Sequence, residues 1–393
     1  MSNQGMNGGG GAAHMGVAAR FGAGLAAVLM GVVVSLVVAG QPGATVVGAG
    51  QPGGGAGTNA NATQGARRFG VEKPIARTPG TVRFATYNIE NLFDDKDDPA
   101  LSGKQEDKGM TKPASHRAAA AAAIRAIDAD VLALQEIESR DALLWFRDEH
   151  LKGMGYEHVV SLDAGDERGI EQAVLSRFPL RDAKQWIKAP LGGTHPAKFG
   201  RDANEYAGQP IVFHRSPLMV TVDVPGPVGQ VGGVGGVGGA GGKPYAMTLL
   251  VVHQKSGGPG AYWREREAAK TVELLLEVQK ADPEANVIIA GDFNAMADSR
   301  EMKVYFDAGL VSLLGDTAKG DPKWVTHASG RAIDHVLFTP AGWREVKPET
   351  RFVLGTIDRP AGADWRTTPA PDGWASDHYP VVVDITPADV PAK

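Results

Sequence analysis

The chain has 393 residues, a formal net charge of −5 at pH 7 and no cysteine. The lack of cysteine excludes a disulfide-bridged scaffold and thiol chemistry, although a domain of this size can be exported without disulfides. The acidic balance excludes the broad basic surface of a protein that binds nucleic acid by neutralising its phosphates. A polyanionic substrate would therefore be bound locally or through a metal ion.

The first 40 residues differ in character from the rest of the chain. A Gly-rich leader and Arg20 precede an uncharged apolar run over residues 21–40. A run of about 18 to 20 apolar residues can span a bilayer, and small residues near its end also suit a signal-peptidase site. We therefore expect residues 1–40 to be a signal peptide or membrane anchor. The protein would then be exported and be periplasmic, extracellular or membrane-anchored. Residues 41–75 lack hydrophobic periodicity and are expected to be a flexible linker.

Residues 76–388 are expected to form one domain, because polar residues at predicted strand ends are spread from Asn88 to His378. Apolar runs predict strands at 81–87, 130–134, 157–162, 172–176, 211–224, 245–252, 287–290, 333–338 and 379–385. Helical spacing and composition predict helices at 115–127, with Ser115 as N-cap, and at 141–151, 261–280 and 299–309.

Two segments of this domain carry few strand or helix signals. Residues 181–209 have few long apolar runs and are expected to be loop-rich, and the Gly/Val-rich residues 225–244 are expected to be a disordered insertion. Strands outnumber helices, and several follow one another without a crossover helix. This pattern favours mixed or antiparallel sheets flanked by helices over a doubly wound parallel sheet.

The stretch VIIAGDFN, residues 287–294, joins a predicted buried strand to a polar turn. Asp292 and Asn294 are two residues apart, so in an extended chain their side chains leave on the same side. A carboxylate and an amide placed in this way can orient a water molecule or bind a phosphoryl oxygen. Taken alone, Asp-x-Asn after a strand more often forms a turn that satisfies its own backbone.

Other predicted strands end in the same kind of residue. Polar side chains stand at or beside strand ends at Asn88, Glu136, Arg177, His253, Asp292, Asn294, Asp334, Asp377 and His378. Hard oxygen donors without cysteine suit Mg²⁺ or Mn²⁺ rather than zinc. Two histidines near carboxylates suit acid–base catalysis and the stabilisation of developing charge. Together they provide what metal-assisted phosphoryl hydrolysis requires.

Seven motifs in order resemble those of the endonuclease/exonuclease/phosphatase superfamily: TYNIEN, LQEIE, AVLSRFP, VHQKS, AGDFN, AIDHVLF and SDHYPVVV. The resemblance covers roughly residues 83–385, and TYNIENLFD is most similar to bacterial exported nuclease-like members. It implies the α/β fold of pancreatic deoxyribonuclease, a four-layer α/β/β/α sandwich. In this fold two mixed, mainly antiparallel sheets are flanked by helices, and the site lies at one rim of the sheets.

The resemblance also implies a metal site and a base. Glu136 would be the principal ligand of Mg²⁺ or Mn²⁺, supported by Asn88 and Asp377. His378, oriented by Asp334, would be the base or the imidazole that polarises the phosphate.

The remaining implied roles concern the substrate. Asp292 would help to activate the attacking water, and Asn294 would hold water or phosphate. His253 would donate to a phosphate oxygen or to the leaving group. Arg177 and Lys255 are expected to contact the substrate phosphate.

The sequence departs from the family pattern in places. Family members usually have asparagine before the histidine of VHQKS, where this chain has Val252. The Trp-Cys-Asp-Arg signature of inositol polyphosphate 5-phosphatases is absent, and LQEIE replaces the LQETK typical of abasic-site endonucleases.

Some of these residues could have other roles. Rather than contacting phosphate, Arg177 could form a surface ion pair with Glu136. Trp365 and Trp374 could stack on a base or a lipid, or could cover the core.

These observations predict a divalent-metal-dependent phosphodiester hydrolase, and the leading hypothesis is an exported or membrane-anchored nuclease. It is expected to be monomeric and to act on nucleic acid or another phosphoester, and residues 21–40 could bind a membrane. One alternative is a phosphomonoesterase or a sphingomyelinase-like lipid phosphodiesterase. Another is a non-catalytic surface binding module, against which the presence of both Glu136 and His378 argues.

Overall fold

A computed structural model describes residues 65–99, 101, 105, 107–225, 244–315 and 320–392. The expected leader, most of the expected linker and residues 226–243 of the Gly/Val-rich insertion lie outside the described residues. Within the described ranges, no helix is long and apolar enough to cross a membrane.

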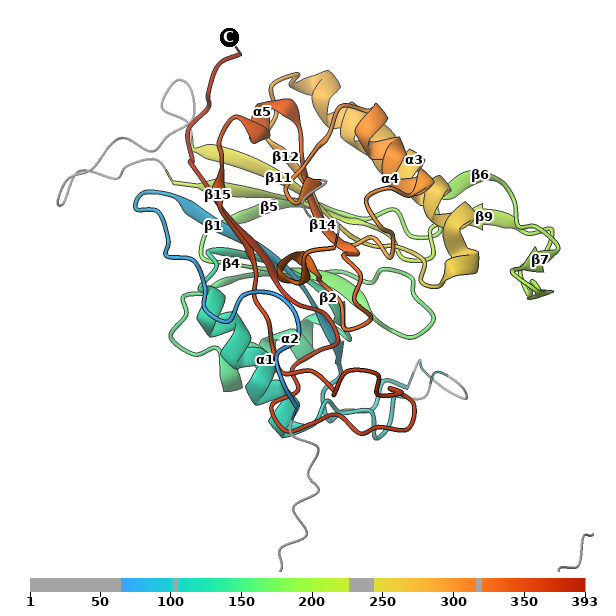
Figure 1. Ribbon diagram of the computed structural model, residues 1–393. Coiled ribbons are helices and arrows are strands. Elements are labelled where there is room, and N and C mark those ends of the chain that lie inside the picture. Colours follow the sequence, from blue (N-terminus) through green and yellow to red (C-terminus); the bar gives the residue numbers. More distant parts are fainter. Residues whose placement is uncertain are drawn as a thin grey trace, which may run out of the picture. The chain divides into compact units, whose positions relative to one another are not determined.

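Two six-stranded sheets form the centre of the domain (Figure 1). The first has the order β15-β16-β1-β2-β4-β3, with β1 (Val82–Leu92), β2 (Val131–Ile137), β3 (His158–Ser161), β4 (Glu171–Ser176), β15 (Val346–Val353) and β16 (Val381–Ile385). The second has the order β13-β14-β12-β11-β10-β5, with β5 (Leu180–Lys184), β10 (Leu218–Val224), β11 (Tyr245–His253), β12 (Val287–Asp292), β13 (Val311–Ser312) and β14 (Asp334–Phe338).

Each sheet contains one parallel pair, β1 with β2 and β11 with β12, and its other pairs are antiparallel. Helices α1 (Ala114–Ile127) and α2 (Arg140–His150) cover the first sheet, whereas α3 (Ala261–Ala281) and α4 (Arg300–Asp307) cover the second (Figure 1). The remaining short helices are η3 (Gly258–Gly260), η5 (Pro322–Trp324) and α5 (Pro340–Trp343). The predicted four-layer α/β/β/α sandwich is confirmed.

The main core fills the space between the two sheets. Alternate residues of β1 face different layers: Phe84 packs in the core shared with the second sheet, whereas Ala85 and Tyr87 pack beneath α1 and α2. Opposite Phe84, the second sheet contributes residues such as Leu249 and Val336. Burying one such side chain stabilises the fold by about 1.5–3 kcal/mol. The alternation of side chains along a strand thus fixes which polar residues at the rim face the space between the two sheets.

The predicted strand over residues 211–224 is wrong at its centre. β9 (Pro210–Val212) and β10 are separate strands, and β9 pairs with β6 (Pro190–Thr194) in a small second layer. Pro217, which has no backbone N–H, stands immediately before β10. The segment expected to be loop-rich also contains β7 (Lys198–Phe199) and β8 (Asp202–Ala203).

Three further expectations need correction. Ser115 is not the N-cap of α1, because Pro113 occupies that position and makes no side-chain cap. β15 was not predicted: it is an edge strand that contains Pro348, and an edge strand tolerates a proline because one of its sides needs no backbone donor. The linker does not extend to residue 75: Arg68 forms an ion pair of 3.0 Å with Asp358, and Val71 donates to the carbonyl of Val353.

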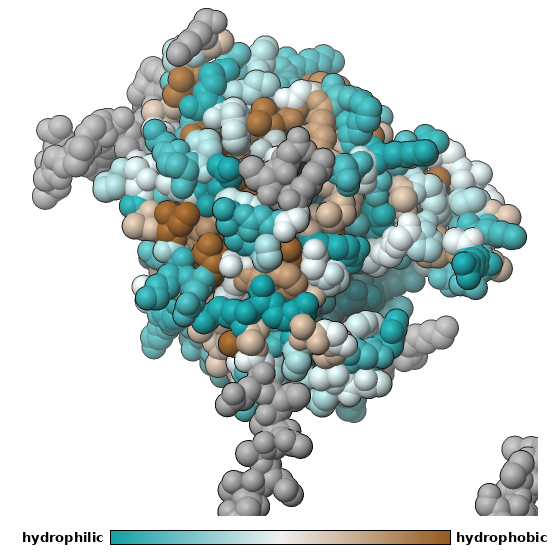
Figure 2. Space-filling model, viewed as in Figure 1, coloured by the Kyte–Doolittle hydropathy of each residue, from teal (hydrophilic) through white to brown (hydrophobic). Residues whose placement is uncertain are grey.

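The face of the domain seen in Figure 2 is mostly hydrophilic, and its hydrophobic residues occur singly or in small groups. Of the two tryptophans before the SDH motif, Trp374 is buried, and its indole N–H donates to Glu90 Oε2 over 2.7 Å. Trp365 is 66% exposed. Trp374 therefore covers the core, and only Trp365 remains available for stacking.

Candidate active site

The predicted catalytic residues meet at one rim because of how the strands are paired. His253 and Asp292 end the parallel strands β11 and β12 and are register partners. Asp334 begins β14 opposite Asp292, since β12 and β14 are antiparallel. His378 stands before β16, whose first residue, Val381, pairs with Thr86 of β1. Ends of parallel strands and starts of their antiparallel neighbours thus share one edge.

Two irregularities in the first sheet aim its polar residues at this rim. The pairing of β2 shifts register around Glu136, which has a positive φ of 62°. β1 also shifts register after Asn88, and Glu90 and Asn91 have φ values of 56° and 50°. Bulges of this kind redirect a side chain that would otherwise follow the alternation. Here Glu136 accepts a hydrogen bond of 3.0 Å from the backbone N–H of Asn91.

Asn88 joins the two sheets at the site. Its amide nitrogen lies 3.3 Å from Glu136 Oε1, 3.3 Å from Asp292 Oδ2 and 3.4 Å from His378 Nε2. Its oxygen accepts the backbone N–H of Glu90 over 3.0 Å. In this orientation Asn88 presents a donor to the site, so the predicted metal ligation through its oxygen would require the amide to rotate.

His378 is held by a buried carboxylate. Its Nδ1 donates to Asp334 Oδ2 over 2.9 Å, and the Thr326 hydroxyl donates to the same oxygen over 2.7 Å. Burial by itself lowers the pKa of His378, but the charges of Asp334 and Asp292 outweigh it and hold that pKa well above 6.5. The ring is therefore an imidazolium at neutral pH, oriented by Asp334 as predicted.

Asp292 faces both histidines. Its Oδ2 lies 3.5 Å from His253 Nε2 and 3.7 Å from His378 Nε2. Burial raises the pKa of Asp292 to about 6, and Asp334 adds to that rise while His378 opposes it. Asn294 donates its amide to Asp292 Oδ2 over 3.1 Å and to the carbonyl of Gln254 over 3.1 Å. Asn294 thus fixes the carboxylate and the turn together.

The turn after β12 depends on Gly291. Its φ is 140°, and a Cβ at this position would lie 2.0 Å from the carbonyl oxygen of Val252. Any side chain would push β12 away from β11 and displace Asp292 from His253. The glycine of the AGDFN motif is therefore required by close backbone approach.

His253 differs from His378 in charge. Burial lowers its pKa well below 6.5, and the nearby Arg215 and His378 charges lower it further, so the imidazole is neutral. Its Nε2 lies 3.8 Å from Glu136 Oε1 as well as beside Asp292. Among the described residues, Nδ1 of His253 has no hydrogen-bond partner. Val252, which stands where family members usually have asparagine, has no side-chain polar atom to supply one.

The structure does not bring Arg177 to the predicted site, and Arg177 pairs with Asp128 and Asp130 rather than with Glu136. Arg177 follows β4 at the end where β2 begins, because Val131 pairs with Ser176. Its guanidinium donates to Asp130 Oδ1 over 2.9 Å, to Asp128 and to the carbonyl of Met154. The five residues from Val131 to Glu136 place it roughly 17 Å from the site at about 3.3 Å per residue.

Arg168, in the loop before β4, is the arginine that lies at the site. Its guanidinium is 3.6 Å from Glu136 Oε2 and also donates to Asn91 Oδ1. Its side chain is 42% exposed, so it can meet a substrate. Arg168 was not predicted, because it belongs to an acidic loop, DAGDERG, that lies outside the seven motifs.

Lys255 lies two residues after His253 and is half-buried beside aromatic rings. Its Nζ is 5.7 Å from the centre of the Phe199 ring and 5.8 Å from that of Trp263. Burial lowers its pKa, and the charge of Arg215 adds to that effect. The predicted contact of Lys255 with phosphate stays a prediction.

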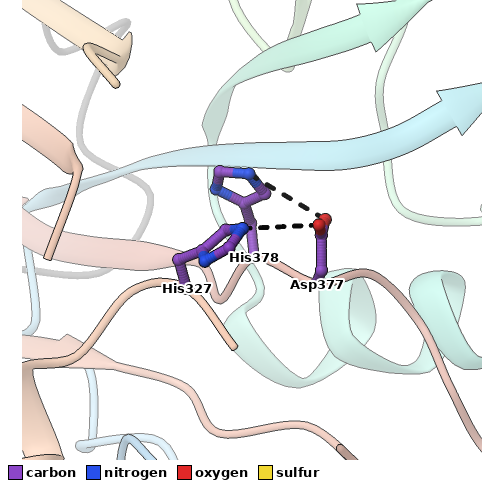
Figure 3. A group of neighbouring side chains, drawn as sticks. All are labelled: His327, Asp377 and His378. Carbon is purple, nitrogen blue, oxygen red and sulfur yellow. Dashed lines mark ion pairs between the residues drawn. The ribbon is translucent and has the colours of Figure 1, made fainter. Parts of the chain in front are cut away.

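Asp377 is a second carboxylate that approaches Nε2 of His378. Its Oδ1 is 3.9 Å from His378 Nε2, and its Oδ2 is 3.4 Å from Nε2 of His327 (Figure 3). His327, in the loop between η5 and β14, was not predicted. Its only signal in the sequence is a position shortly before the AIDHVLF motif.

The donor set fits a divalent cation. Glu136, Asp292 and Asp377 offer carboxylate oxygens at one rim, and Asp292 is a buried carboxylate with a raised pKa, as expected where a cation would relieve the charge. Asp292, Asp334 and His378 have ligand atoms within 4.8 Å of one another. Carboxylate oxygens such as those of Glu136 and Asp292 suit Mg²⁺ or Mn²⁺.

Comparisons with solved structures give matches at low identity and with TM-scores below 0.5. The catalytic domain of human Nocturnin with a bound sulfate anion has a TM-score of 0.46 and 14% identity, covering 79% of this chain and 95% of that chain. An endonuclease/exonuclease/phosphatase from Beutenbergia cavernae DSM 12333 has a TM-score of 0.43 and 21% identity, covering 78% and 71%. A mannosyl-6-phosphatase from Bacteroides thetaiotaomicron VPI-5482 has a TM-score of 0.42 and 15% identity, covering 77% and 98%.

A comparison with curated protein sequences gives no match. By contrast, the sequence model of the endonuclease/exonuclease/phosphatase family matches residues 85–378, a range that begins before Asn88 and ends at His378. The chain therefore belongs to the endonuclease/exonuclease/phosphatase family, and it is a metal-dependent hydrolase of phosphoric esters.

Proposed function

We propose that this hydrolase cleaves phosphodiesters, with nucleic acid as its substrate class and Mg²⁺ or Mn²⁺ as its ion. The supporting observation is the pair of histidines on either side of Asp292. His378 is charged and His253 is neutral, although both rings lie within 3.7 Å of the same carboxylate oxygen. Two imidazoles in different protonation states suit a reaction that needs both charge stabilisation and a neutral donor.

Asp292 is the group that takes the proton of the attacking water in this proposal. Its carboxylate is fixed by Asn88 and Asn294 amides at 3.3 Å and 3.1 Å, so one oxygen direction is set before substrate binds. A base that is already in position lowers the activation free energy, because no further ordering of its side chain is needed. The pKa of about 6 leaves it mostly ionised at neutral pH and more basic than an exposed aspartate.

The two histidines act on the phosphoryl group and its leaving oxygen. The imidazolium of His378 stabilises charge that develops on a non-bridging oxygen, and Asp334 keeps that ring in place. The neutral His253 donates its Nε2 proton toward the leaving group. Arg168, beside Glu136, neutralises a further phosphate oxygen. When bound at Glu136, with Asp377 nearby, the divalent ion supplies Lewis-acid stabilisation of the phosphoryl oxygens.

We also propose that the protein acts outside the cytoplasm. The apolar run at residues 21–40, preceded by Arg20, supports export or anchoring. Fractionation of cells that express the full chain should recover it outside the cytosol, and deletion of residues 21–40 should retain it in the cytosol. Cytosolic recovery of the undeleted protein would contradict this part of the proposal.

The deciding experiment compares a generic phosphodiester with the matching phosphomonoester, using the full chain with Mg²⁺ or Mn²⁺. Glu136→Gln is the control for contaminating hydrolases. Diester turnover that needs both metal and Glu136 is the expected result, followed by panels of DNA, RNA and sphingomyelin vesicles. Preference for the monoester would make the protein a phosphatase. Preference for lipid headgroups would replace nucleic acid as substrate, and no turnover would favour a binding module.

A further inference from the structure

His327, Asp377 and His378 bring two imidazole nitrogens and a carboxylate to one point (Figure 3). Asp377 Oδ2 is 3.4 Å from His327 Nε2, and Asp377 Oδ1 is 3.9 Å from His378 Nε2. The backbone also joins the two loops, because His327 and His378 form a β-bridge and Ala328 N–H donates to the Asp377 carbonyl over 2.7 Å. The three side chains are therefore held together by the fold.

This donor set differs in kind from the carboxylates around Glu136. Two histidines and one carboxylate, with a fourth position open to water, form the three-ligand arrangement typical of zinc. All three ligand atoms lie within 4.8 Å of one another. Bonds of about 2.0–2.2 Å in a tetrahedron require ligand atoms about 3.4 Å apart, so each side chain would move by less than about 1 Å.

Both histidines have a partner for the nitrogen that faces away from this point. His378 Nδ1 lies 2.9 Å from Asp334 Oδ2, the carboxylate–histidine pairing found behind metal-binding imidazoles. His327 Nδ1 lies 2.7 Å from Ser329 Oγ and accepts the Ser329 backbone N–H over 3.0 Å. Nδ1 of His327 therefore contacts Ser329, and Nε2 faces Asp377.

Zinc binds an imidazole nitrogen that carries no proton, so each ring must present Nε2 unprotonated, and any proton that the ion displaces passes to solvent.

We propose that His327, Asp377 and His378 form a zinc-binding site that shares Asp377 with the Mg²⁺ site predicted at Glu136, and that zinc bound there inhibits hydrolysis. Inhibition follows because zinc would occupy His378 Nε2, which the hydrolytic mechanism uses. The inhibition depends on the proposed function, whereas the binding itself does not.

Zinc binding is measured first, on the full chain without other divalent ions, by competition with a chromophoric zinc chelator. His327→Gln should weaken zinc binding by about tenfold or more, since it removes one of three ligands. His158→Gln is the matched control, because His158 lies on the edge strand β3 and should leave zinc affinity unchanged. Equal zinc affinity in the wild type and His327→Gln would overturn the site.

Co²⁺ gives a second readout that does not depend on comparing affinities. A four-coordinate Co²⁺ ion at His327, Asp377 and His378 has a visible absorption band, which His327→Gln should abolish and His158→Gln should preserve. Circular dichroism of both variants excludes misfolding as the cause. A band that persists in His327→Gln would place the ion elsewhere and reject the proposed ligands.

Inhibition is then measured as zinc titration of Mg²⁺-dependent diester hydrolysis, with each variant compared with its own zinc-free rate. The zinc concentration for half inhibition should rise about tenfold or more in His327→Gln. Equal sensitivity would show that zinc acts at another position, such as Glu136, and would overturn the inhibitory role. If no hydrolysis is found with any substrate, the proposed function fails, while chelator competition still decides the zinc site.

Discussion

Asp292 and Asp334 stand opposite each other on β12 and β14, and the ring of His378 lies between their carboxylates. Nδ1 of the ring is 2.9 Å from Asp334 Oδ2, and Nε2 is 3.7 Å from Asp292 Oδ2. Two like charges in directly opposite positions on a sheet are destabilising unless a cation compensates them. The imidazolium of His378 is that cation, and the arrangement accounts for its raised pKa.

Replacing Asp334 by Asn should leave the fold intact and reduce kcat by about 10²- to 10⁴-fold. Asn cannot supply the charge that keeps His378 protonated and oriented, and loss of an orienting carboxylate has effects of this size in other acid–base pairs. The descending limb of the pH–rate profile should move to lower pH, because the pKa of His378 falls.

The control for Asp334→Asn is Thr326→Val, which removes only the hydroxyl that donates to Asp334. It should have a smaller effect on kcat and little on the pH profile. A profile unchanged in Asp334→Asn would contradict the role of Asp334.

Replacing Asp292 by Asn should abolish hydrolysis and stabilise the protein in EDTA. The folded-state pKa of Asp292 is about 6, above its ordinary value of 3.8, so the folded protein binds more protons between these values. Stability due to this group is present at low pH and is lost as pH rises from about 4 to about 6. A rise of about 2 pKa units corresponds to about 3 kcal/mol.

The gain in the free energy of unfolding of Asp292→Asn over the wild type should therefore be largest above pH 6 and vanish near pH 4. Urea unfolding at several pH values measures it. A variant that is less stable than the wild type at pH 8 would show that the ionised Asp292 carboxylate stabilises the folded protein, and would contradict this prediction.

Glu136→Gln should lose most metal-dependent turnover and also lose stabilisation by Mg²⁺. A ligand that binds only the folded state raises its stability, by about 2.7 kcal/mol at 100 times Kd. Thermal unfolding with and without Mg²⁺ measures this effect separately from catalysis. Asp141→Asn, in the first turn of α2, is a control that should keep the Mg²⁺ effect. Equal Mg²⁺ stabilisation in Glu136→Gln would exclude Glu136 as the main ligand.

Arg168→Met and Arg177→Met should have opposite consequences. Arg168 lies beside Glu136 and is partly exposed, so its loss should lower kcat/KM by about 10- to 100-fold, the size of one charged hydrogen bond. Stability should change little.

Arg177 binds Asp128, Asp130 and a backbone carbonyl away from the site. Arg177→Met should therefore cost about 1–3 kcal/mol of stability and leave kcat/KM close to that of the wild type. Measuring both quantities on both variants tests the assignment, which fails if Arg177→Met alone impairs catalysis.

The sequence predicts the fold well where the spacing of apolar residues and the polar residues at the strand end indicate the same element. β12 and its turn follow from four apolar residues and a glycine, and the parallel and antiparallel pairing then brings Asp292, Asp334 and His253 together. Arg177 and Arg168 show the limit of this reasoning. Both adjoin β4, but only the direction of that strand in the sheet decides which arginine reaches Glu136. No local sequence pattern indicates the direction in which β4 runs within the sheet.

Other parts were missed because tertiary contacts override local signals. β15 contains proline and alternates poorly, yet it adds to the sheet as an edge strand. Residues 65–75 lack periodicity but are held by Asp358 and Val353 from far along the chain. His327 has no sequence signal of its own, because its relation to Asp377 arises from the β-bridge between two loops.

Asn88 links the two sheets of the sandwich, since it belongs to the first sheet and donates to Asp292 of the second. The hydrolytic centre is therefore shared, and neither half possesses it alone. A small displacement of one sheet relative to the other would abolish hydrolysis, although each sheet would keep its own hydrogen bonds. Catalytic rate should thus report sandwich opening in mild denaturant before circular dichroism detects any loss of strands.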